Sequence, residues 1–476
     1  MEQLFGLVLD IRPDVAYALR LAVAVLVTIH VLLTKRDVGS SVAWIGLVWL
    51  SPFLGGFIYF MFGINRVRRR ARTMLGPGET QRRRGRRIAL PPVGDANLSA
   101  LRRGIGALTG KPVEPGNAVK VLQNGDEAYP AMLAAIASAR RSVGISTYIM
   151  RGDAAGQRFI DALKAAQDRG VEVRAIIDGV GSGWVRSPAY NGLRKAGLRA
   201  GRFMHSFLPW RMPFLNLRTH RKILLIDGER AFVGGINIGD ENVLADNPAH
   251  PVQDTHFDIS GPVVAQIAEV FADDWSFLSD EELQGSAWFT APAAQGDAAA
   301  RVISAGPDQD TDQIEFAVLQ AITCARTSVR VMTPYFLPDH QILTALSLAA
   351  MRGVHVEIIV PERGNHRVLD WAIRAHVRSL LTSGCHVMLS PQPFRHSKLF
   401  VVDGEWSLIG SSNWDIRSFR LNFETCVEIY DRPLAADLEQ LMIASRGEAL
   451  TLENLNADGL LVRLRNAAAR LLLPYL

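Results

Sequence analysis

Apolar residues dominate the first 65 positions of the chain, and residues 42–64 contain no charged side chain. A helix of that length, rising about 1.5 Å per residue, would cross the roughly 30 Å hydrocarbon layer of a bilayer, with a kink at Pro52. Residues 15–33 form a second apolar stretch, interrupted by Arg20 and His30, which could each reach the interface or face the partner helix. The pattern predicts a two-helix transmembrane hairpin over residues 1–65.

A cleaved signal peptide is the alternative for this segment. No basic segment precedes the first apolar stretch, however, and Lys35 and Arg36 follow it where a small-residue cleavage site would stand. The membrane anchor is therefore the favoured interpretation.

Basic charge is concentrated directly after the anchor. Residues 66–87 contain ten arginines and one acid, Glu79, although the whole chain carries a net charge of only +5. The remainder is therefore mildly acidic, which is unusual for a nucleic-acid-binding face. We expect residues 66–115 to be an arginine-rich linker that binds anionic headgroups and keeps the following body in the cytoplasm.

The rest of the chain contains an internal repeat. Ala135–Val143 is echoed by Ala321–Val329, and in each copy a helical stretch and a buried strand follow, at Val173–Ile177 and Val356–Val360. Helices that alternate with buried strands indicate an α/β fold. We predict two pseudo-twofold-related lobes, each a mixed sheet flanked by helices, over 116–284 and 301–455, with a linker at 285–300 and an amphipathic C-terminal helix at 456–476.

Each copy also carries an H-x-K-x4-D-G motif. The motifs comprise His220, Lys222 and Asp227 in the first copy, and His396, Lys398 and Asp403 in the second. Only these two of the eleven histidines have a lysine two positions later. Such a long pattern is very improbable as a chance duplication.

Strand geometry predicts how the motif residues are arranged. Side chains at positions i and i+2 of a strand share a face, so each histidine and its lysine should point into one pocket. Asp-Gly then turns the chain into a second strand, and a Gly-x-x-Asn segment brings Asn237 or Asn413 back toward that pocket. Asp227 and Asp403 stand at the turns, where we expect them to brace the motif.

Two acidic residues begin matching strands further along each copy. Asp254 and Glu424 are candidates for orienting the imidazoles, because a carboxylate that accepts one ring N–H selects the tautomer and favours the cation. The alternative is an acidic edge residue that faces water.

These residues resemble the phospholipase D superfamily, whose paired motifs form one site. Within it, the predicted hairpin, Thr333–Phe336 and Gly410–Phe419 resemble bacterial cardiolipin synthases. The resemblance implies a multi-pass inner-membrane enzyme that needs no metal or other cofactor. One histidine, by family precedent His220, would form a phosphohistidine, while His396 serves as acid and base. Lys222, Lys398, Asn237 and Asn413 would hold the phosphate oxygens.

The resemblance also implies phosphatidylglycerol as both donor and acceptor, with glycerol released. Water or another alcohol would instead make the protein a phospholipase D or a phosphatidylserine synthase. A membrane-tethered nuclease is a weaker alternative, given the mildly acidic body, and a noncatalytic lipid-binding scaffold is weaker still, given two complete motifs. The sequence makes no prediction of oligomeric state.

Two further segments leave alternatives open. The apolar, proline-broken stretch His205–Leu217 could dip into the bilayer or pack as an ordinary loop. The C-terminal helix should pack on the second lobe rather than lie in the membrane interface.

Overall fold

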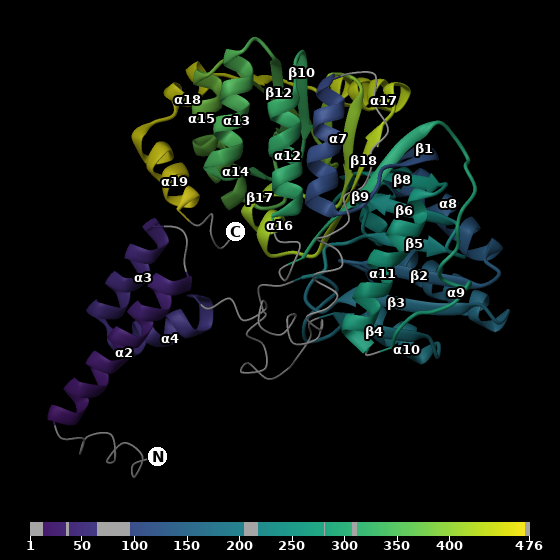
Figure 1. Cartoon of the computed structure of the whole chain (residues 1–476), viewed down its shortest axis with the longest axis horizontal. Helices are drawn as coiled ribbons and strands as arrows, with labels where there is room; N and C mark the ends of the chain where they lie inside the picture. The colour runs from purple at the N-terminus through teal and green to yellow at the C-terminus, as the bar shows by residue number, and fades with distance from the viewer. Residues whose placement is uncertain are drawn as a thin grey trace. The chain divides into compact units, whose positions relative to one another are not determined.

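The computed structural model describes residues 13–34, 38–63, 96–203, 218–279, 281–306 and 312–471 (Figure 1). The chain forms two compact units, Met1–Met74 and Leu75–Leu476. The arginine run at 66–87 and the stretch His205–Leu217 lie outside the described residues.

The N-terminal unit consists of α2 (Pro13–Thr34), α3 (Val38–Leu50), α4 (Pro52–Ile58) and the π-helix η1 (Tyr59–Gly63). Among the described residues, Asp14–Thr34 is the stretch long and apolar enough to cross a membrane, judged by length and composition. The single kinked helix predicted for residues 42–64 is wrong. Ser51 leaves the helical region (φ −145°, ψ 82°) because a residue before proline avoids that region, and a new helix begins at Pro52.

The two polar interruptions of the first apolar stretch face the neighbouring helical segments. The ring Nδ1 of His30 lies 2.7 Å from the hydroxyl of Tyr59, and the guanidinium of Arg20 lies 6.0 Å from the centre of the Phe53 ring. Of the two arrangements that the sequence allowed for these side chains, the structure therefore has the one directed toward a partner helix.

The second unit is built on one sheet of 15 strands. In spatial order, the strands of its first half are β4 (Arg199–Phe203), β3 (Glu172–Asp178), β2 (Ser142–Thr147), β5 (Ile223–Ile226), β6 (Arg230–Gly234), β8 (Thr255–Ser260) and β1 (Glu114–Gln123). The second half continues with β9 (Ala298–Ala305), β18 (Glu424–Tyr430), β16 (Trp406–Gly410), β15 (Leu399–Val402), β10 (Ser328–Met332), β12 (His355–Pro361), β13 (His386–Ser390) and β19 (Ala449–Leu450).

The order of strands is mirrored about the junction between β1 and β9, which pair antiparallel. In both halves a parallel pair, β2 with β3 or β10 with β12, leads to an antiparallel hairpin that carries the motif, β5 with β6 or β15 with β16. The predicted mixed α/β architecture is therefore confirmed. The two halves share one continuous sheet, so they form a single body.

Helices cover both faces of the sheet (Figure 1). One face carries α8 (Asn124–Ser138), α9 (Ala154–Asp168) and α10 (Pro188–Lys195) over the first half, and α7 (Ala96–Thr109), α12 (Gln313–Cys324), α13 (His340–Met351), α14 (Arg367–His376), α15 (Arg378–Thr382), α18 (Leu452–Ala457) and α19 (Leu460–Arg470) over the second. The other face carries α11 (Val263–Ser279) and α17 (Arg432–Ala444) over one core shared by both halves. In β5, Ile223 and Leu225 enter this shared core, while Leu224 and Ile226 enter the opposite one.

Short elements line the edge where the two motifs meet. These are β7 (Val252–Gln253) paired with β14 (Phe394–Arg395), β11 (Phe336–Leu337) paired with β17 (Trp414–Asp415), η3 (Asp240–Asn242), η4 (Leu244–Asp246) and α16 (Ile416–Arg420). Because β7 belongs to the first half and β14 to the second, this pair ties the halves together beside the motifs.

Two predicted segments differ from the expected linkers. Residues 96–109, assigned to the arginine-rich linker, form α7, which packs against α12, and β9 begins inside the segment 285–300. The C-terminal helix α19 packs on α14, where Arg465 lies 4.4 Å from the Trp371 ring centre. The helix therefore contacts the second half, while its Leu460, Leu461 and Leu464 are exposed.

Candidate active site

Each histidine motif begins in an extended segment immediately before its strand. His220 and Lys222 precede β5, and His396 and Lys398 precede β15, so these four residues lie just before the strands rather than within them. All four side chains are buried. The backbone N–H of His220 donates to the carbonyl of Phe423 (2.9 Å), and that of His396 to the carbonyl of Gln253 (2.6 Å). Each motif is therefore docked on the other half of the sheet.

Each motif histidine lies beside a carboxylate that comes from the other half of the sheet. Nδ1 of His220 lies 3.0 Å from a carboxylate oxygen of Glu424, and Nδ1 of His396 lies 2.7 Å from Oδ2 of Asp254. Each of the two motif histidines is therefore paired with a carboxylate from the other half. The arrangement leaves Nε2 of each imidazole for a ligand, provided that Nδ1 carries the proton.

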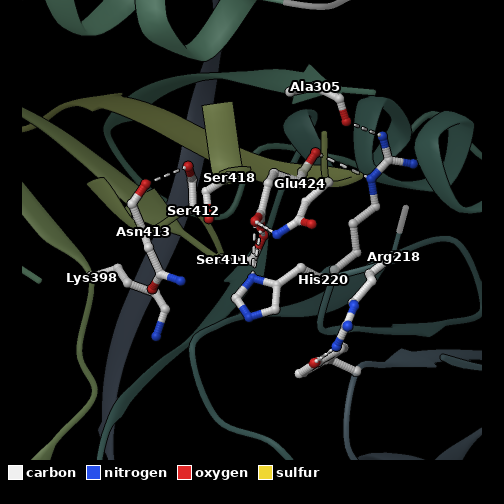
Figure 2. A network of polar contacts seen from close by, with 12 residues as sticks. Arg218, His220, Ala305, Lys398, Ser411, Ser412, Asn413, Ser418 and Glu424 are labelled. Atoms are coloured by element: carbon white, nitrogen blue, oxygen red, sulfur yellow. Dashed lines mark hydrogen bonds and ion pairs between the residues drawn. The ribbon is translucent and has the colours of Figure 1, made fainter. Parts of the chain in front are cut away.

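A second layer of hydrogen bonds holds the two carboxylates in place. Glu424 accepts from the hydroxyl of Ser411 (2.5 Å) and from the amide nitrogen of Asn422 (3.2 Å). Figure 2 shows the His220 ring below Glu424 and Ser411, with Asn413 and Lys398 to one side and Arg218 to the other. Asp254 accepts from the backbone N–H of Thr255 (2.7 Å).

The two lysines lie against the histidines of their own motifs. Nζ of Lys222 donates to the carbonyl of His220 (2.7 Å) and stands 5.3 Å from the centre of the Tyr148 ring. Nζ of Lys398 lies 2.9 Å from Nδ1 of His396 and 3.8 Å from Asp254. Two ammonium groups are thus buried close to the same space, an arrangement suited to an anion.

Burial lowers the pKa of all four basic groups of the site. Burial lowers the pKa of Lys222 to about 7 and that of Lys398 to about 8. Burial, together with the charges of the two lysines, holds the pKa of His220 well below its usual range and lowers the pKa of His396 to about 4. Both imidazoles are therefore neutral at neutral pH.

The two carboxylates are not equivalent. Burial raises the pKa of Glu424 to about 7, against the opposing effect of Lys222. Burial acts on Asp254 in the same direction, but Lys398 and His396 together outweigh it and lower the pKa of Asp254 below its ordinary value. Asp254 is therefore ionised at neutral pH, whereas Glu424 is poised between its two forms.

The histidines open into one cavity of about 360 Å³. Its lining includes Tyr148, Tyr335, Arg151, Arg218, Asn237, Glu241, Phe394, Asn413, Asp415 and Arg417. Oδ1 of Asn237 accepts from the backbone N–H of Ile149 (3.1 Å), which leaves its amide nitrogen as the donor. Oδ1 of Asn413 is buried and has no hydrogen-bond partner among the described residues.

Asp227 and Asp403 do not line this cavity. Both stand in the left-handed region (φ 54° and 55°), and each carboxylate accepts three successive backbone N–H groups at the start of the neighbouring strand. For Asp227 the last donor is Ser142, at 2.9 Å, and for Asp403 it is Ser328, also at 2.9 Å. They fasten the motif hairpin to strands β2 and β10, as the bracing role requires.

Four supporting residues were not anticipated from the sequence. Asp178 at the end of β3 accepts from the backbone N–H of Thr219 (3.0 Å), and Ser397 and Thr255 share a hydrogen bond (2.9 Å) between the halves. In the sequence, Ser411 is a polar residue directly after the second strand of the second motif hairpin, and the first copy has Gly235 at the corresponding position. The repeat alone therefore carried no signal for it.

A family model described as "Cardiolipin synthase, PLD-like domain" matches residues 132–275 and 318–445. A second model, "Phospholipase_D-nuclease N-terminal", matches residues 22–63. The two segments of the first match contain both motifs and both carboxylates. With the apolar helix Asp14–Thr34, these matches indicate a membrane-associated protein.

Curated relatives cover almost the whole chain. It is 34% identical to a cardiolipin synthase of Geobacillus sp. (strain WCH70) over 93% of this chain and 90% of that protein, and 31% identical to the major cardiolipin synthase ClsA of Bacillus subtilis (strain 168) over 93% and 95%. Among solved structures, a phosphatidylserine synthase of Haemophilus influenzae Rd KW20 shares the fold, with a TM-score of 0.62 at 16% identity over 79% of this chain and 100% of that one.

Proposed function

Because the chain belongs to the cardiolipin synthase family of phospholipase D-like enzymes, we propose that it transfers a phosphatidyl group from one phosphatidylglycerol to another and releases glycerol. The observation that carries the proposal is that two histidines, each paired with a carboxylate from the other half, line a single cavity. A neutral nucleophile and a separate proton carrier are the two parts that a double displacement at phosphorus needs.

In the first step, Nε2 of His220 attacks the phosphorus of the donor lipid. The N–P bond forms while the bond from phosphorus to the glycerol oxygen breaks, and His396 gives its proton to that oxygen. His220 suits the role because its depressed pKa leaves the ring neutral, and because the carboxylate of Glu424 selects the tautomer with the proton on Nδ1.

The acid role of His396 depends on the bound substrate. Burial and the lysine charges lower the pKa of His396 to about 4, so before the substrate binds few of its rings are protonated at neutral pH. A phosphodiester carries one negative charge, which would sit beside Lys222 and Lys398 and offset their effect. With Asp254 ionised 2.7 Å away, the imidazolium form of His396 then becomes favourable.

In the second step, a second phosphatidylglycerol replaces the departed glycerol. Its free primary hydroxyl loses a proton to His396 and attacks phosphorus, the N–P bond breaks, and cardiolipin leaves with His220 regenerated. No proton is gained or lost over the cycle. The amide groups of Asn237 and Asn413, which line the cavity, stabilise the nonbridging oxygens as charge develops on them. The ammonium groups of Lys222 and Lys398, buried beside the two histidines, add to that stabilisation.

The proposal also covers the membrane arrangement. We place α2 as one crossing and α3 with α4 as the returning one, which makes a two-pass anchor in the bacterial inner membrane. The arginines at 66–87 would then hold the catalytic body on the cytoplasmic side, against anionic lipid. The two lobes at 116–284 and 301–455 would act as one catalytic unit, with no nucleic-acid substrate.

Water or another alcohol could accept the same phosphatidyl group, as in a phospholipase D or a phosphatidylserine synthase. The test is mass spectrometry of the products after purified full-length protein is incubated with phosphatidylglycerol and a chelator. Cardiolipin plus free glycerol is expected. Phosphatidic acid alone would reassign the protein to the hydrolases. Unchanged lipid turnover in His220→Ala or His396→Ala would refute the proposed chemistry.

A further inference from the structure

Helix α19 directs its apolar side away from the body on which it packs. The leucines of the helix and of its C-terminal cap are 57–81% exposed: Leu460, Leu461, Leu464 and Leu471. The side turned toward the protein carries the buried Asn466 and Ala469 instead. A surface helix that only packs on a globular body has the opposite arrangement, with its leucines inward and its polar residues outward.

The exposed leucines share one face of the helix. At 3.6 residues per turn, Leu460, Leu464 and Leu471 fall within about 40° of one another around the axis, and Leu461 lies at the edge of the same face. Arginines border this face on both sides, namely Arg463 and Arg470 on one and Arg465 on the other. An apolar face bordered by basic residues is typical of helices that lie in the surface of an anionic bilayer.

The charges around α19 also favour an anionic partner. Residues 367–382 and 452–471, which include α14, α15, α18 and α19, contain six arginines and three acids, a net charge of +3 with histidine counted as neutral. Two of the acids, Asp370 and Asp458, are engaged: Asp370 accepts from the backbone N–H of Gly364 (3.1 Å), and Asp458 pairs with Arg374 (3.6 Å). The third, Glu453, precedes α19 on α18.

The exposed face lies close to the cavity that contains the two histidines. Helix α14 begins at this cavity, since its N-cap His366 and Leu369 of its first turn both belong to the lining. Helix α19 packs on α14 (Figure 1), with Arg465 over the ring of Trp371. The leucine face is therefore only one helix away from the cavity.

We propose that α19 is an interfacial helix, whose leucines insert among the acyl chains at the surface of an anionic bilayer while its arginines contact the lipid headgroups. The membrane is the partner that fits both the apolar face and its basic borders, and the chain is membrane-associated. Because α19 also packs on α14, its insertion holds the cavity at the level where phospholipid headgroups lie. The helix thus packs on the second half and lies in the interface at once, although the sequence presented these two uses as alternatives.

The test places a fluorophore on the leucine face of the full-length protein reconstituted into vesicles. Nitrobenzoxadiazole is attached to Leu464→Cys in a Cys324→Ala background, because Cys385 and Cys426 are buried. The vesicles contain phosphatidylcholine alone, or phosphatidylcholine and phosphatidylglycerol in equal amounts, with or without a lipid that carries a spin label on its acyl chain. The spin-labelled lipid is expected to quench the fluorophore in the mixed vesicles. Since it is present in both leaflets, the result does not depend on how the protein is oriented.

The quenched and unquenched components of the fluorescence decay give the ratio of inserted to free helix. Arg463→Gln and Arg470→Gln should each lower this ratio about fivefold in the mixed vesicles, the contribution of one arginine near an anionic surface. Leu460→Gln should lower it about tenfold, because it removes a leucine side chain from the apolar contact.

Two matched controls lie elsewhere on the body. Leu348 is 51% exposed on α13, near the edge of the sheet where β12 begins, so a label on Leu348→Cys should escape quenching. Arg432→Gln removes one exposed positive charge from α17, on the other face of the sheet, and should leave the ratio at the Leu464→Cys label unchanged.

A Leu464→Cys label that the spin-labelled lipid does not quench in either type of vesicle would overturn the proposal. If that unquenched label is also shielded from aqueous iodide, the N-terminal unit or a second copy of the chain covers the leucine face instead. Equal quenching with and without phosphatidylglycerol, or equal quenching of the labels on α19 and α13, would also contradict it. None of these measurements uses lipid turnover, so their outcome is independent of the proposed reaction.

Discussion

The unequal carboxylates predict that two isosteric substitutions have different pH dependences. Glu424→Gln and Asp254→Asn each replace a carboxylate oxygen that faces a histidine by an amide. With a pKa of about 7, Glu424 is ionised in roughly a tenth of molecules at pH 6 and in about nine-tenths at pH 8. Asp254 has a pKa below its ordinary value and remains ionised over that whole range.

The expected loss of rate in each variant follows from the role of the carboxylate charge that is removed. Ionised Glu424 keeps the proton of His220 on Nδ1, and a hydrogen bond to a charged group stabilises by about 1.5–3 kcal/mol. We therefore expect Glu424→Gln to be close to wild type at pH 6 and about tenfold or more slower at pH 8. Asp254→Asn removes the charge that favours the His396 cation, and should be about 10- to 100-fold slower at every pH from 6 to 8.

The assay is the initial rate of cardiolipin formation from phosphatidylglycerol in detergent, measured at saturating lipid for wild type and both variants at several pH values. The quantity compared is the ratio of wild-type to variant kcat. A ratio for Glu424→Gln that is constant or falls with pH would refute the reasoning, as would a ratio for Asp254→Asn that rises steeply between pH 6 and pH 8.

Three further outcomes are expected. Asp403→Ala removes the acceptor of three backbone N–H groups and should lower the free energy of unfolding of the body by about 2 kcal/mol, measured by denaturant unfolding; an unchanged midpoint would contradict the bracing role. Glu428→Gln leaves the fully buried Arg301 without its counter-charge and should destabilise by about 3–5 kcal/mol, whereas replacing both Arg301 and Glu428 with apolar residues should recover much of the loss. Excess chelator should leave the transfer rate unchanged, because the proposed steps use only side chains; a loss that added metal restores would contradict them.

The internal repeat was the most informative feature of the sequence. It predicted a mirrored α/β body, because duplicated segments tend to fold alike, and the strand order about β1 and β9 has that symmetry. The motif strands and the two candidate acids could be located from spacing alone. The spacing could not predict which acid pairs with which histidine. Glu424 pairs with His220 and Asp254 with His396, so each pair depends on contacts between residues far apart in the chain.

Local hydropathy was less reliable. Residues 42–64 contain no charged side chain, and their hydropathy alone does not predict that Ser51 leaves the helical region before Pro52. Helix α7 was assigned to a linker because it follows the arginine run, although its Leu101 and Ile105 enter the core of the second half. The local steric effect of Pro52 decided the first case, and tertiary burial, which no single segment encodes, decided the second.

The most direct test of the central claim uses a donor in which p-nitrophenol replaces glycerol, because this leaving group departs without a proton from His396. The account predicts that His396→Ala releases a burst of nitrophenolate stoichiometric with enzyme, then stalls with a phosphatidyl group on His220 that mass spectrometry of peptides can locate, whereas His220→Ala gives no burst. A burst in His220→Ala with none in His396→Ala would exchange the two roles. No adduct in either variant would contradict the covalent mechanism itself.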